Sequence, residues 1–552
     1  MASYGFLFGC VFSVGAFYLR SPTKKSIAPS SASSPTSPSS ASSSIDAAIS
    51  NLRTHFGDRA SICLSTDATD LESKGFSSWC QHAASLPSVV AFPESTDDVV
   101  AIVNAARNHG VPLLPFAGGT SLEAHWYAPR FEGEGESGET RPSISVCFER
   151  MAEILEVDEE NGMARVQPGV GWQDLNEELK ERGSRLFWPI DPGPGACFGG
   201  MLATGGSGTG AVRYGTMKGE LVLNVTVVLP SGKVIKTRSD ARKSSAGPDL
   251  TRLFLGSEGT LGVITEATLR LVPRLEESVT TVSFPTVEDA SKAARAVLYK
   301  GIAVSSVELL DEVMIRSINQ ASSQTGSSSR QPLAEQPSLF LKFAGSSPAN
   351  VKEDQRMARE VVLEHKADPA TLRISSSPQE VEELWEARKV ALWSAMASRE
   401  GKEEGKGQPR AWTTDVCVPV ARLPDLVRRL KADVAEHGLF APIVGHVGDG
   451  NVHAIFVYPD GDSEELAAVT ESVHRMVEWA QQLGGTCTGE HGVGRGKREF
   501  LEAELGSGTL GLLREIKGLI DPEGVMNPGA LLPPKGSERR GEQGSPLAKH
   551  AT

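Results

Sequence analysis

Three glycine-dense loops between residues 117 and 262 constrain the fold of this chain more than any other feature. The first, AGGTSLE at residues 117–123, directly follows an apolar run. The others are GGMLATGGSGTG at residues 199–210 and GSEGTLG at residues 256–262. Glycine lets the backbone approach a ligand closely, and successive N–H groups form an anion-binding nest. One such loop is usually only a turn, but three predict a backbone wrapped around a large, pyrophosphate-bearing ligand.

Strands and helices alternate around these loops. Residues 89–93 and 111–116 read as strands, and the helix between them begins at Ser95 and ends at Gly110. None of the loops opens a helix with G-x-G-x-x-G in a strand–helix–strand unit, which disfavours a Rossmann nucleotide site. Strand-like sequence continues to Pro273. We therefore predict an α+β domain here.

The first 45 residues read as a targeting or disordered segment. Residues 5–19 are apolar but shorter than the roughly 20 residues of a membrane-spanning helix. Residues 26–44 are rich in Ser, Pro and Ala, and a helical pattern begins only at Ile45. The absence of acids before Asp46 and the serine content favour a mitochondrial presequence. An endoplasmic reticulum or secretory signal anchor is the alternative, and the apolar run allows membrane association.

Net charge and cysteine usage exclude two classes of protein. The formal net charge is −14, without a basic stripe that could grip phosphates, so nucleic acid is not an expected partner. The seven cysteines are widely spread, odd in number and free of any C-x-x-C pair. They indicate reduced thiols instead of a disulfide scaffold or a cysteine metal site.

Two glycine-bracketed stretches hold the residues with the clearest chemistry. In GHVGDGNVH at residues 445–453, a glycine turn can direct His446 and His453 toward one point. Glu490 follows about forty residues later, and the three side chains suit zinc, manganese or iron. His491 is next to the carboxylate and is a candidate proton acceptor. The alternative is a set of unrelated, hydrogen-bonded histidines beside ordinary loop glycines.

Six motifs together resemble the vanillyl-alcohol-oxidase superfamily, in the type 4 family of FAD-binding oxidoreductases and transferases that contains the cytochrome-linked D-lactate dehydrogenases. The resemblance covers roughly residues 50–532. The motifs are PFAGGTSLE at residues 115–123, the segment from DPG to YGTM at 191–217, GSEGTLGVIT at 256–265, the stretch at 445–453, TCTGEHGVG at 486–494 and DPEGVMNPGALL at 521–532.

This resemblance implies a domain organisation within the α+β class. A two-subdomain FAD-binding domain of the PCMH type is expected at residues 85–275, after an N-terminal helical segment at residues 46–84. A ferredoxin-like substrate domain, the FAD-linked oxidase C-terminal domain, is expected at residues 276–532, with a last helical segment that returns to the flavin. Residues 533–552 read as a disordered tail.

The resemblance also implies which residues hold the cofactor. Some superfamily members bind flavin covalently through a histidine in the first glycine loop, where this chain has Thr120. Noncovalent FAD is therefore expected. The implied FAD-binding residues are Phe116, Ala117, Gly118, Gly119, Thr120, Ser121, Leu122, Pro192, Gly193, Gly199, Gly200, Ala203, Thr204, Ser207, Gly208, Gly262, Ile264 and Asn527.

An arginine lies within the apolar face of the helix that Ser377 is expected to cap. Arg388 shares one helical stripe with Val381, Leu384, Trp385 and Leu392. A partly buried cation requires an anion, and a substrate carboxylate pairs with arginine bidentately. The resemblance likewise implies a carboxylate-binding arginine in this helix. The alternative is an arginine whose stem packs while its head reaches water.

The expected reaction is oxidation of a D-2-hydroxy acid to a 2-oxo acid. Arg388 would hold the substrate carboxylate, and a divalent zinc or manganese ion on His446, His453 and Glu490 would polarise the hydroxyl. His491 would remove the hydroxyl proton while the carbon delivers a hydride to flavin. The resemblance implies cytochrome c or another respiratory carrier as the electron acceptor.

D-Lactate, which yields pyruvate, is the expected substrate. Related D-2-hydroxyglutarate enzymes have a lysine where this chain has Thr413 and a polar residue where it has Ile455. A second substrate carboxylate would thus lack obvious partners. D-2-hydroxyglutarate or glycolate dehydrogenase is the alternative within the family. A metal-dependent hydrolase and a non-catalytic flavin- or metal-binding subunit are the alternatives outside it.

Overall fold

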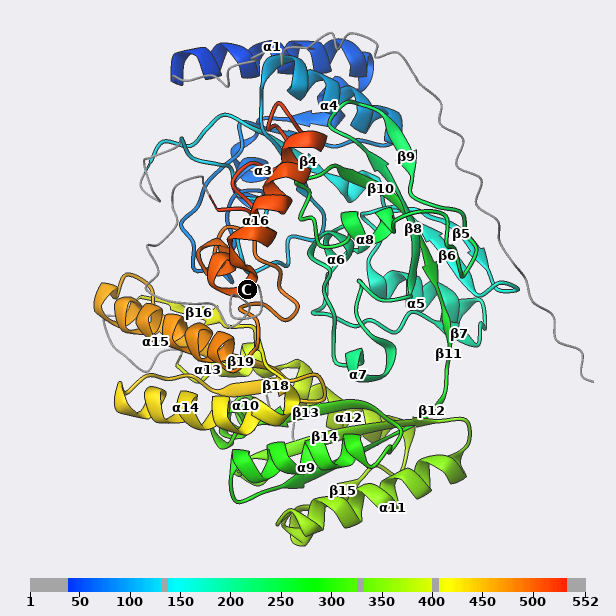
Figure 1. Ribbon diagram of the computed structural model, residues 1–552, viewed down its shortest axis with the longest axis vertical. Helices are drawn as coiled ribbons and strands as arrows, with labels where there is room; N and C mark the ends of the chain where they lie inside the picture. The colour runs from blue at the N-terminus through cyan, green and yellow to red at the C-terminus, as the bar shows by residue number, and fades with distance from the viewer. Residues whose placement is uncertain (1–37, 132–137, 325–331, 400–406, 534–552) are drawn as a thin grey trace, which may run out of the picture.

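The computed structural model forms two domains that meet along one side of each (Figure 1). It describes residues 38–131, 138–324, 332–399 and 407–533. The predicted targeting segment up to residue 37 and the tail from residue 534 lie outside the described residues. The first domain carries the glycine loops, and the second is built on one large sheet.

The first subdomain is a four-stranded sheet in the order β1-β2-β4-β3, with β2 and β3 both parallel to β4. Helix α4 (Thr96–His109) begins and ends where predicted. The Ser95 side chain accepts a hydrogen bond from the Asp98 N–H, and Gly110 closes the helix with a left-handed φ of 64°. The strands are β1 (Leu64–Ser65), β2 (Val89–Ala91), β3 (Leu113–Phe116) and β4 (Ile144–Cys147).

Helix α1 (Pro38–Phe56) begins seven residues before the predicted start at Ile45. The helix thus starts earlier than the sequence pattern predicted, and the targeting segment at residues 1–45 stays a prediction. Ala41, Ile45 and Ala48 recur at helical spacing and are 4%, 5% and 0% exposed, so they form an apolar face despite the surrounding serines. The rest of the N-terminal segment is helical as expected, with α2 (Ala60–Cys63) and α3 (Ala68–Ser73).

The second subdomain is an antiparallel five-stranded sheet in the order β5-β6-β10-β8-β9. Its strands are β5 (Ile154–Asp158), β6 (Met163–Val166), β8 (Val222–Val228), β9 (Val234–Lys236) and β10 (Val263–Arg270), and a separate pair is formed by β7 (Leu186–Phe187) and β11 (Val272–Pro273). Its helices are α5 (Trp172–Glu181), α6 (Phe198–Thr204), α7 (Ala211–Tyr214) and α8 (Leu250–Phe254). The predicted two-subdomain arrangement is confirmed.

The second domain begins with a ferredoxin-like unit, as predicted. Its four antiparallel strands have the order β15-β12-β14-β13, with a helix crossing over in each half. The Thr286 side chain caps the first of these helices by accepting a hydrogen bond from the Asp289 N–H. The elements are β12 (Glu276–Ser283), α9 (Val287–Tyr299), β13 (Val304–Leu310), β14 (Ser338–Gly345), α11 (Pro348–Glu364) and β15 (Arg373–Ile374).

More strands widen this sheet beyond β13. Strand β13 pairs with β18, which forms a hairpin with β19, and β19 pairs with both β16 and β17. These strands are β16 (Pro409–Thr413), β17 (Val416–Cys417), β18 (Ile443–His446) and β19 (Asn451–Pro459). Two apolar cores lie on opposite faces of the sheet. One lies under α9, α11, α14 (Leu423–Glu436) and α15 (Ser463–Gln482), and the other under α10 (Glu312–Gln324), α12 (Pro378–Lys389) and α13 (Ala391–Ala397).

The chain then returns to the first domain through α16 (Leu501–Ile520), as Figure 1 shows. Leu113 of β3 donates its N–H to the Val525 carbonyl at 2.8 Å, and Asn527 donates its N–H to the Leu113 carbonyl at 2.9 Å. The predicted return of the C-terminal segment is thus confirmed.

Among the described residues, every helix is too short or too polar to cross a bilayer. The apolar run at residues 5–19 lies outside them.

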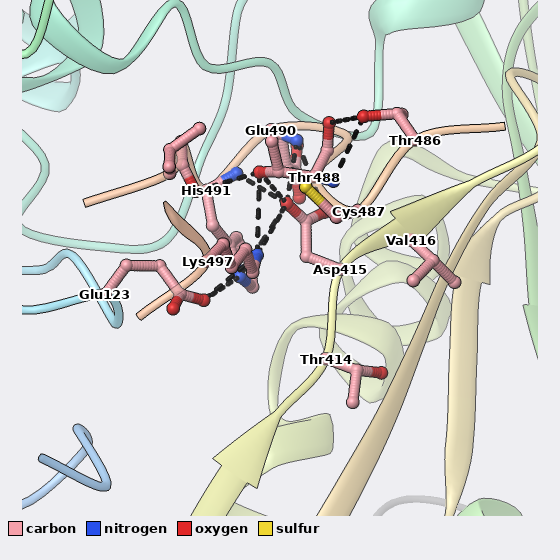
Figure 2. A network of polar contacts seen from close by, with 12 residues as sticks. Glu123, Thr414, Asp415, Val416, Thr486, Cys487, Thr488, Glu490, His491 and Lys497 are labelled. Atoms are coloured by element: carbon pink, nitrogen blue, oxygen red, sulfur yellow. Dashed lines mark hydrogen bonds and ion pairs between the residues drawn. The ribbon is translucent and has the colours of Figure 1, made fainter. Parts of the chain in front are cut away.

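A buried lysine links the two domains (Figure 2). Lys497 of the second domain lies 3.0 Å from Glu123 of the first domain and 3.4 Å from Asp415 of its own domain. Their side chains are 7%, 2% and 0% exposed. Burial lowers the pKa of Lys497, but Glu123 and Asp415 outweigh it and hold the lysine in its charged form. The lysine therefore stabilises the two buried carboxylates, and they stabilise the charged lysine.

We expect Lys497→Met to destabilise the protein by about 3–5 kcal/mol, because it leaves two carboxylates buried without their cation. Lys292→Met is the matched control, since Lys292 is half exposed and pairs with Glu288 only across one helical turn at 2.7 Å. That change should cost at most about 0.5 kcal/mol. Thermal and denaturant unfolding of both variants measures the difference. Equal stability of the two variants would show that the buried network contributes nothing.

Candidate functional site

A cavity of about 550 Å³ lies where the two domains meet. The first domain lines it with all three glycine loops, and the second contributes Lys389, Leu392, Trp393, Glu490, His491 and Asn527. Residues from both domains therefore line one cavity. This is the geometry expected for a cofactor that one domain holds and the other supplies with substrate.

Most of the residues predicted to bind FAD line this cavity. They are Ala117, Gly118, Gly119, Thr120, Ser121, Leu122, Pro192, Gly193, Gly199, Gly200, Ala203, Thr204, Ser207, Gly262, Ile264 and Asn527. Phe116 and Gly208 do not. The Phe116 ring packs edge-on against Trp126 with centroids 5.5 Å apart, and a Cβ on Gly208 would lie 2.5 Å from the Asp191 carboxylate. Both residues therefore contact other parts of the first domain and do not line the cavity.

The first glycine loop lies close to the segment before α6 because Gly118 lacks a side chain. A Cβ on Gly118 would lie 2.3 Å from the Gly195 carbonyl oxygen, so only glycine allows this contact between the first loop and the segment before α6. Gly200, in contrast, has nothing within 4 Å of the position of a Cβ and lines the cavity. At Gly200 the backbone thus faces the cavity without a side chain in between, which fits a large ligand with a pyrophosphate.

Two tryptophans that the motifs did not indicate also line the cavity. The rings of Trp79 and Trp393 meet edge-on with centroids 4.2 Å apart, and Trp393 is 53% exposed. They come from the N-terminal segment and from α13. Neither lies in a glycine loop or a histidine motif, so the sequence carries no local signal that they meet.

The two histidines of the predicted metal-binding trio both face Glu490. His446 ends β18 and His453 lies on β19, and the turn between them is closed by the Asp449 N–H, which donates to the His446 carbonyl at 3.0 Å. The Nε2 atoms of His446 and His453 lie 3.1 Å and 3.4 Å from the same Glu490 oxygen, Oε1. The hairpin therefore brings the two imidazoles together, and a separate loop adds Glu490, which is 44 residues from His446 in the sequence.

Partners fix the orientation of each member of the trio. The His446 Nδ1 lies 2.7 Å from Glu308 Oε1, and the His453 Nδ1 lies 2.8 Å from the Thr414 carbonyl oxygen. Each ring thus directs its Nε2 toward Glu490. The Ser207 hydroxyl donates to Glu490 Oε2 at 2.6 Å, which ties the trio to the second glycine loop. Two oriented imidazoles and a carboxylate fit a divalent cation such as zinc or manganese.

Charge coupling within the trio is strong. Removal from water raises the pKa of Glu490, but His446 and His453 outweigh this and hold it well below its usual range. Burial lowers the pKa of His446, but Glu308 and Glu490 outweigh this and hold it well above its usual range. The trio therefore already contains the anionic oxygen that a cation would bind.

Asp415 lies next to the trio but acts on the backbone. One carboxylate oxygen of Asp415 lies within 4.8 Å of a donor atom on each of His453, Glu490 and His491. Its carboxylate already accepts hydrogen bonds from the N–H groups of Glu490 and His491 at 3.0 Å and 2.8 Å, and from the Thr488 hydroxyl at 2.8 Å. Figure 2 shows this arrangement. Asp415 therefore holds the loop that carries Glu490. His446 is not part of this group of mutually close donor atoms, although its Nε2 lies 3.1 Å from Glu490 Oε1.

His491 lies against the trio and lines the cavity. Its ring stacks on that of His453 with centroids 5.1 Å apart. Its Nδ1 is buried without a hydrogen-bond partner among the described residues and lies 3.9 Å from Glu123. Burial lowers the pKa of His491, so its neutral form, which can accept a proton, is favoured.

Arg388 has a protein partner that the sequence did not indicate. The expected cap by Ser377 is confirmed, and Arg388 lies in the last turn of α12. Its Nε donates to Glu308 Oε2 at 2.6 Å, and its side chain is only 12% exposed. The anion beside Arg388 in the structure is thus Glu308, a single acid in an apolar strand. The terminal Nη groups have no hydrogen-bond partner among the described residues.

Comparisons with known proteins agree with this fold. Residues 87–238 match the family model of an FAD binding domain, and residues 275–531 match that of the C-terminal domain of FAD linked oxidases. A solved structure of 4-ethylphenol oxidase from Gulosibacter chungangensis has the same fold, with a TM-score of 0.68 at 17% identity, over 88% of this chain and 97% of that one.

Three curated relatives cover most of the chain. A mitochondrial D-lactate dehydrogenase [cytochrome] from Arabidopsis thaliana is 42% identical over 453 residues, which are 82% of this chain and 74% of the relative. One from Saccharomyces cerevisiae is 42% identical over 448 residues, 80% of this chain and 72% of the relative. A D-2-hydroxyglutarate dehydrogenase from Stutzerimonas stutzeri is 29% identical over 482 residues, 84% and 95% of the two chains.

Both halves of the chain, its fold and its cofactor cavity thus lead to one assignment. The chain belongs to the family of FAD-linked oxidoreductases that includes the cytochrome-linked D-lactate dehydrogenases.

Proposed function

We propose that this protein oxidises D-lactate to pyruvate with noncovalently bound FAD, and that it passes the electrons to cytochrome c or another respiratory carrier. The observation that carries the proposal is the 2.6 Å hydrogen bond from Ser207 to Glu490. It joins a loop of the FAD-binding domain to the histidine–carboxylate trio. Oxidation of an alcohol by flavin requires this proximity between a flavin cavity and polar groups that can activate a hydroxyl.

Different residues of this chain bind different groups of the substrate. Arg388, through its terminal Nη groups, binds the carboxylate, and His491 accepts the hydroxyl proton in its neutral form. Bound FAD supplies the two-electron acceptor. His446, His453 and Glu490 would hold a zinc or manganese ion, and such an ion would supply Lewis-acid polarisation of the substrate oxygens. The placement of Ser207 keeps Glu490 beside the flavin loops.

Two positions support a small substrate side chain. Ile455 is 2% exposed and belongs to the apolar core under α10, α12 and α13. It is paired in register with Thr413, so neither position offers a cation to a second carboxylate. This favours D-lactate over D-2-hydroxyglutarate.

The location proposed for the protein is the mitochondrion. Its relatives from Arabidopsis thaliana and Saccharomyces cerevisiae are both named mitochondrial. The acid-free, serine-rich residues 1–45 suit a presequence.

The purified protein should be yellow, and anaerobic D-lactate should bleach its flavin absorption. L-Lactate should not, because it presents its hydrogen on the wrong side of the carbon. Stopped-flow spectra with D-lactate, glycolate and D-2-hydroxyglutarate rank the substrates, and we expect D-lactate to react fastest. A colourless protein would favour a hydrolase, and a yellow protein that none of these acids bleaches would favour a non-catalytic subunit.

We expect His491→Ala to slow flavin reduction about 10²–10⁴-fold, since that is the usual contribution of a general base. FAD content should not change, because the flavin loops are untouched. His474→Ala is the matched control, since His474 lies on α15 and contacts Glu499 and Phe500 instead of the cavity. A rate for His491→Ala within a few-fold of the control would place the proton acceptor elsewhere.

Treatment with a chelator should remove the metal and stop turnover while FAD stays bound. Zinc or manganese should restore turnover, and the ion that restores it identifies the natural occupant. Metal analysis should find about one ion per chain in the untreated protein and none in His453→Ala, because that change removes one of three ligands. Full metal content in His453→Ala would contradict the proposed ligand set.

A further inference from the structure

A buried glutamate connects the metal-binding trio to the arginine of α12. Glu308 lies in β13 and its side chain is 0% exposed. Antiparallel register places it directly opposite His446 on β18, so both side chains project from the same face of the sheet. Helix α12 covers this face, and Arg388 reaches Glu308 from it.

Each carboxylate oxygen of Glu308 has its own partner. Oε1 lies 2.7 Å from His446 Nδ1, and Oε2 accepts the Arg388 Nε–H at 2.6 Å. One carboxylate therefore orients two cationic or polar groups from different elements. Neither His446 nor Arg388 can rotate away without leaving a buried oxygen unpaired.

Stability alone does not account for an acid at this position. Removing a carboxylate from water is costly, and well-packed apolar residues often replace a buried ion pair without loss. On the same face of β13, the next inward residue is Leu310, a 0% exposed core residue. The contacts that distinguish Glu308 from this neighbour are those with His446 and Arg388.

We propose that Glu308 is a positioning residue that couples metal binding to substrate binding. The inference rests on the proposed function, because it takes His446 as a metal ligand and Arg388 as the carboxylate anchor. Glu308 accepts the His446 Nδ1–H, which directs the Nε2 lone pair to the metal and makes the ring a better ligand. Its second oxygen occupies the Arg388 Nε, which leaves both Nη groups of the guanidinium for a substrate carboxylate.

The test is Glu308→Gln in the full chain with FAD bound. Glutamine keeps the volume but has one acceptor oxygen, so it cannot accept from both His446 and Arg388. We expect zinc or manganese affinity, measured by competition with a chromophoric chelator, to fall about 10–100-fold. The KM for D-lactate should rise about tenfold, which corresponds to one charge-assisted hydrogen bond. FAD content should not change.

Asp311→Asn is the matched control. Asp311 is a 1% exposed acid just after β13, and it accepts hydrogen bonds from Lys431 and from the Met314 and Ile443 N–H groups. It lies on the same pair of strands as Glu308 and His446 but contacts neither His446 nor Arg388 among the described residues. Its loss should lower the unfolding temperature but leave metal affinity within about twofold. If Glu308→Gln proves too unstable, Glu308→Asp keeps the charge but is too short to reach both partners, and the same losses are expected.

Three outcomes overturn the inference, and they are distinguishable. Equal metal affinity of Glu308→Gln and the wild type would overturn it while leaving the proposed function intact. Equal losses in Asp311→Asn and Glu308→Gln would show general loosening of the sheet instead of positioning. A wild type that binds no zinc or manganese would overturn both the inference and the proposed metal site.

Discussion

The loop that carries Glu490 and His491 is held in place by buried carboxylates, and the rest of the site depends on that attachment. Asp415 accepts the N–H groups of both residues from within the second domain. From the first domain, the Glu258 oxygens accept the N–H groups of Val493 and Gly494 at 2.6 Å and 2.8 Å. A loop without regular hydrogen bonding thereby becomes rigid, because leaving any of these groups unpaired in the interior is costly.

This attachment explains how chemistry is divided between the domains. The first domain offers mostly backbone to the cavity, because its glycines leave no side chains between the chain and a large ligand. The second domain offers side chains, which project from a rigid sheet and from the clamped loop. Strand register, not loop conformation, places Glu308 beside His446 and Val444 beside His453. The two histidines and Glu308 thus stand on the sheet, while Glu490 and His491 depend on the loop that Asp415 and Glu258 hold.

Local sequence patterns predicted much of the architecture. The caps at Ser95, Thr286 and Ser377 mark helix starts that the structure confirms. The glycine loops indicated the cavity, and the histidine hairpin indicated the trio. These predictions were possible because a cap, a turn or a hairpin depends on residues a few positions apart. Where local composition was misleading, as in the serine-rich start of α1, burial of Ala41 and Ile45 against the fold decided the outcome.

The sequence by itself thus determined the element types, the glycine cradle and the identity of the metal-binding candidates. Only the tertiary structure decided which groups orient them. Glu308 meets His446 across 138 residues and Arg388 across 80, and Ser207 meets Glu490 across 283. No short motif records such pairs, because strand order and domain contact create them. Glu308 therefore meets His446 and Arg388 only in the assembled sheet.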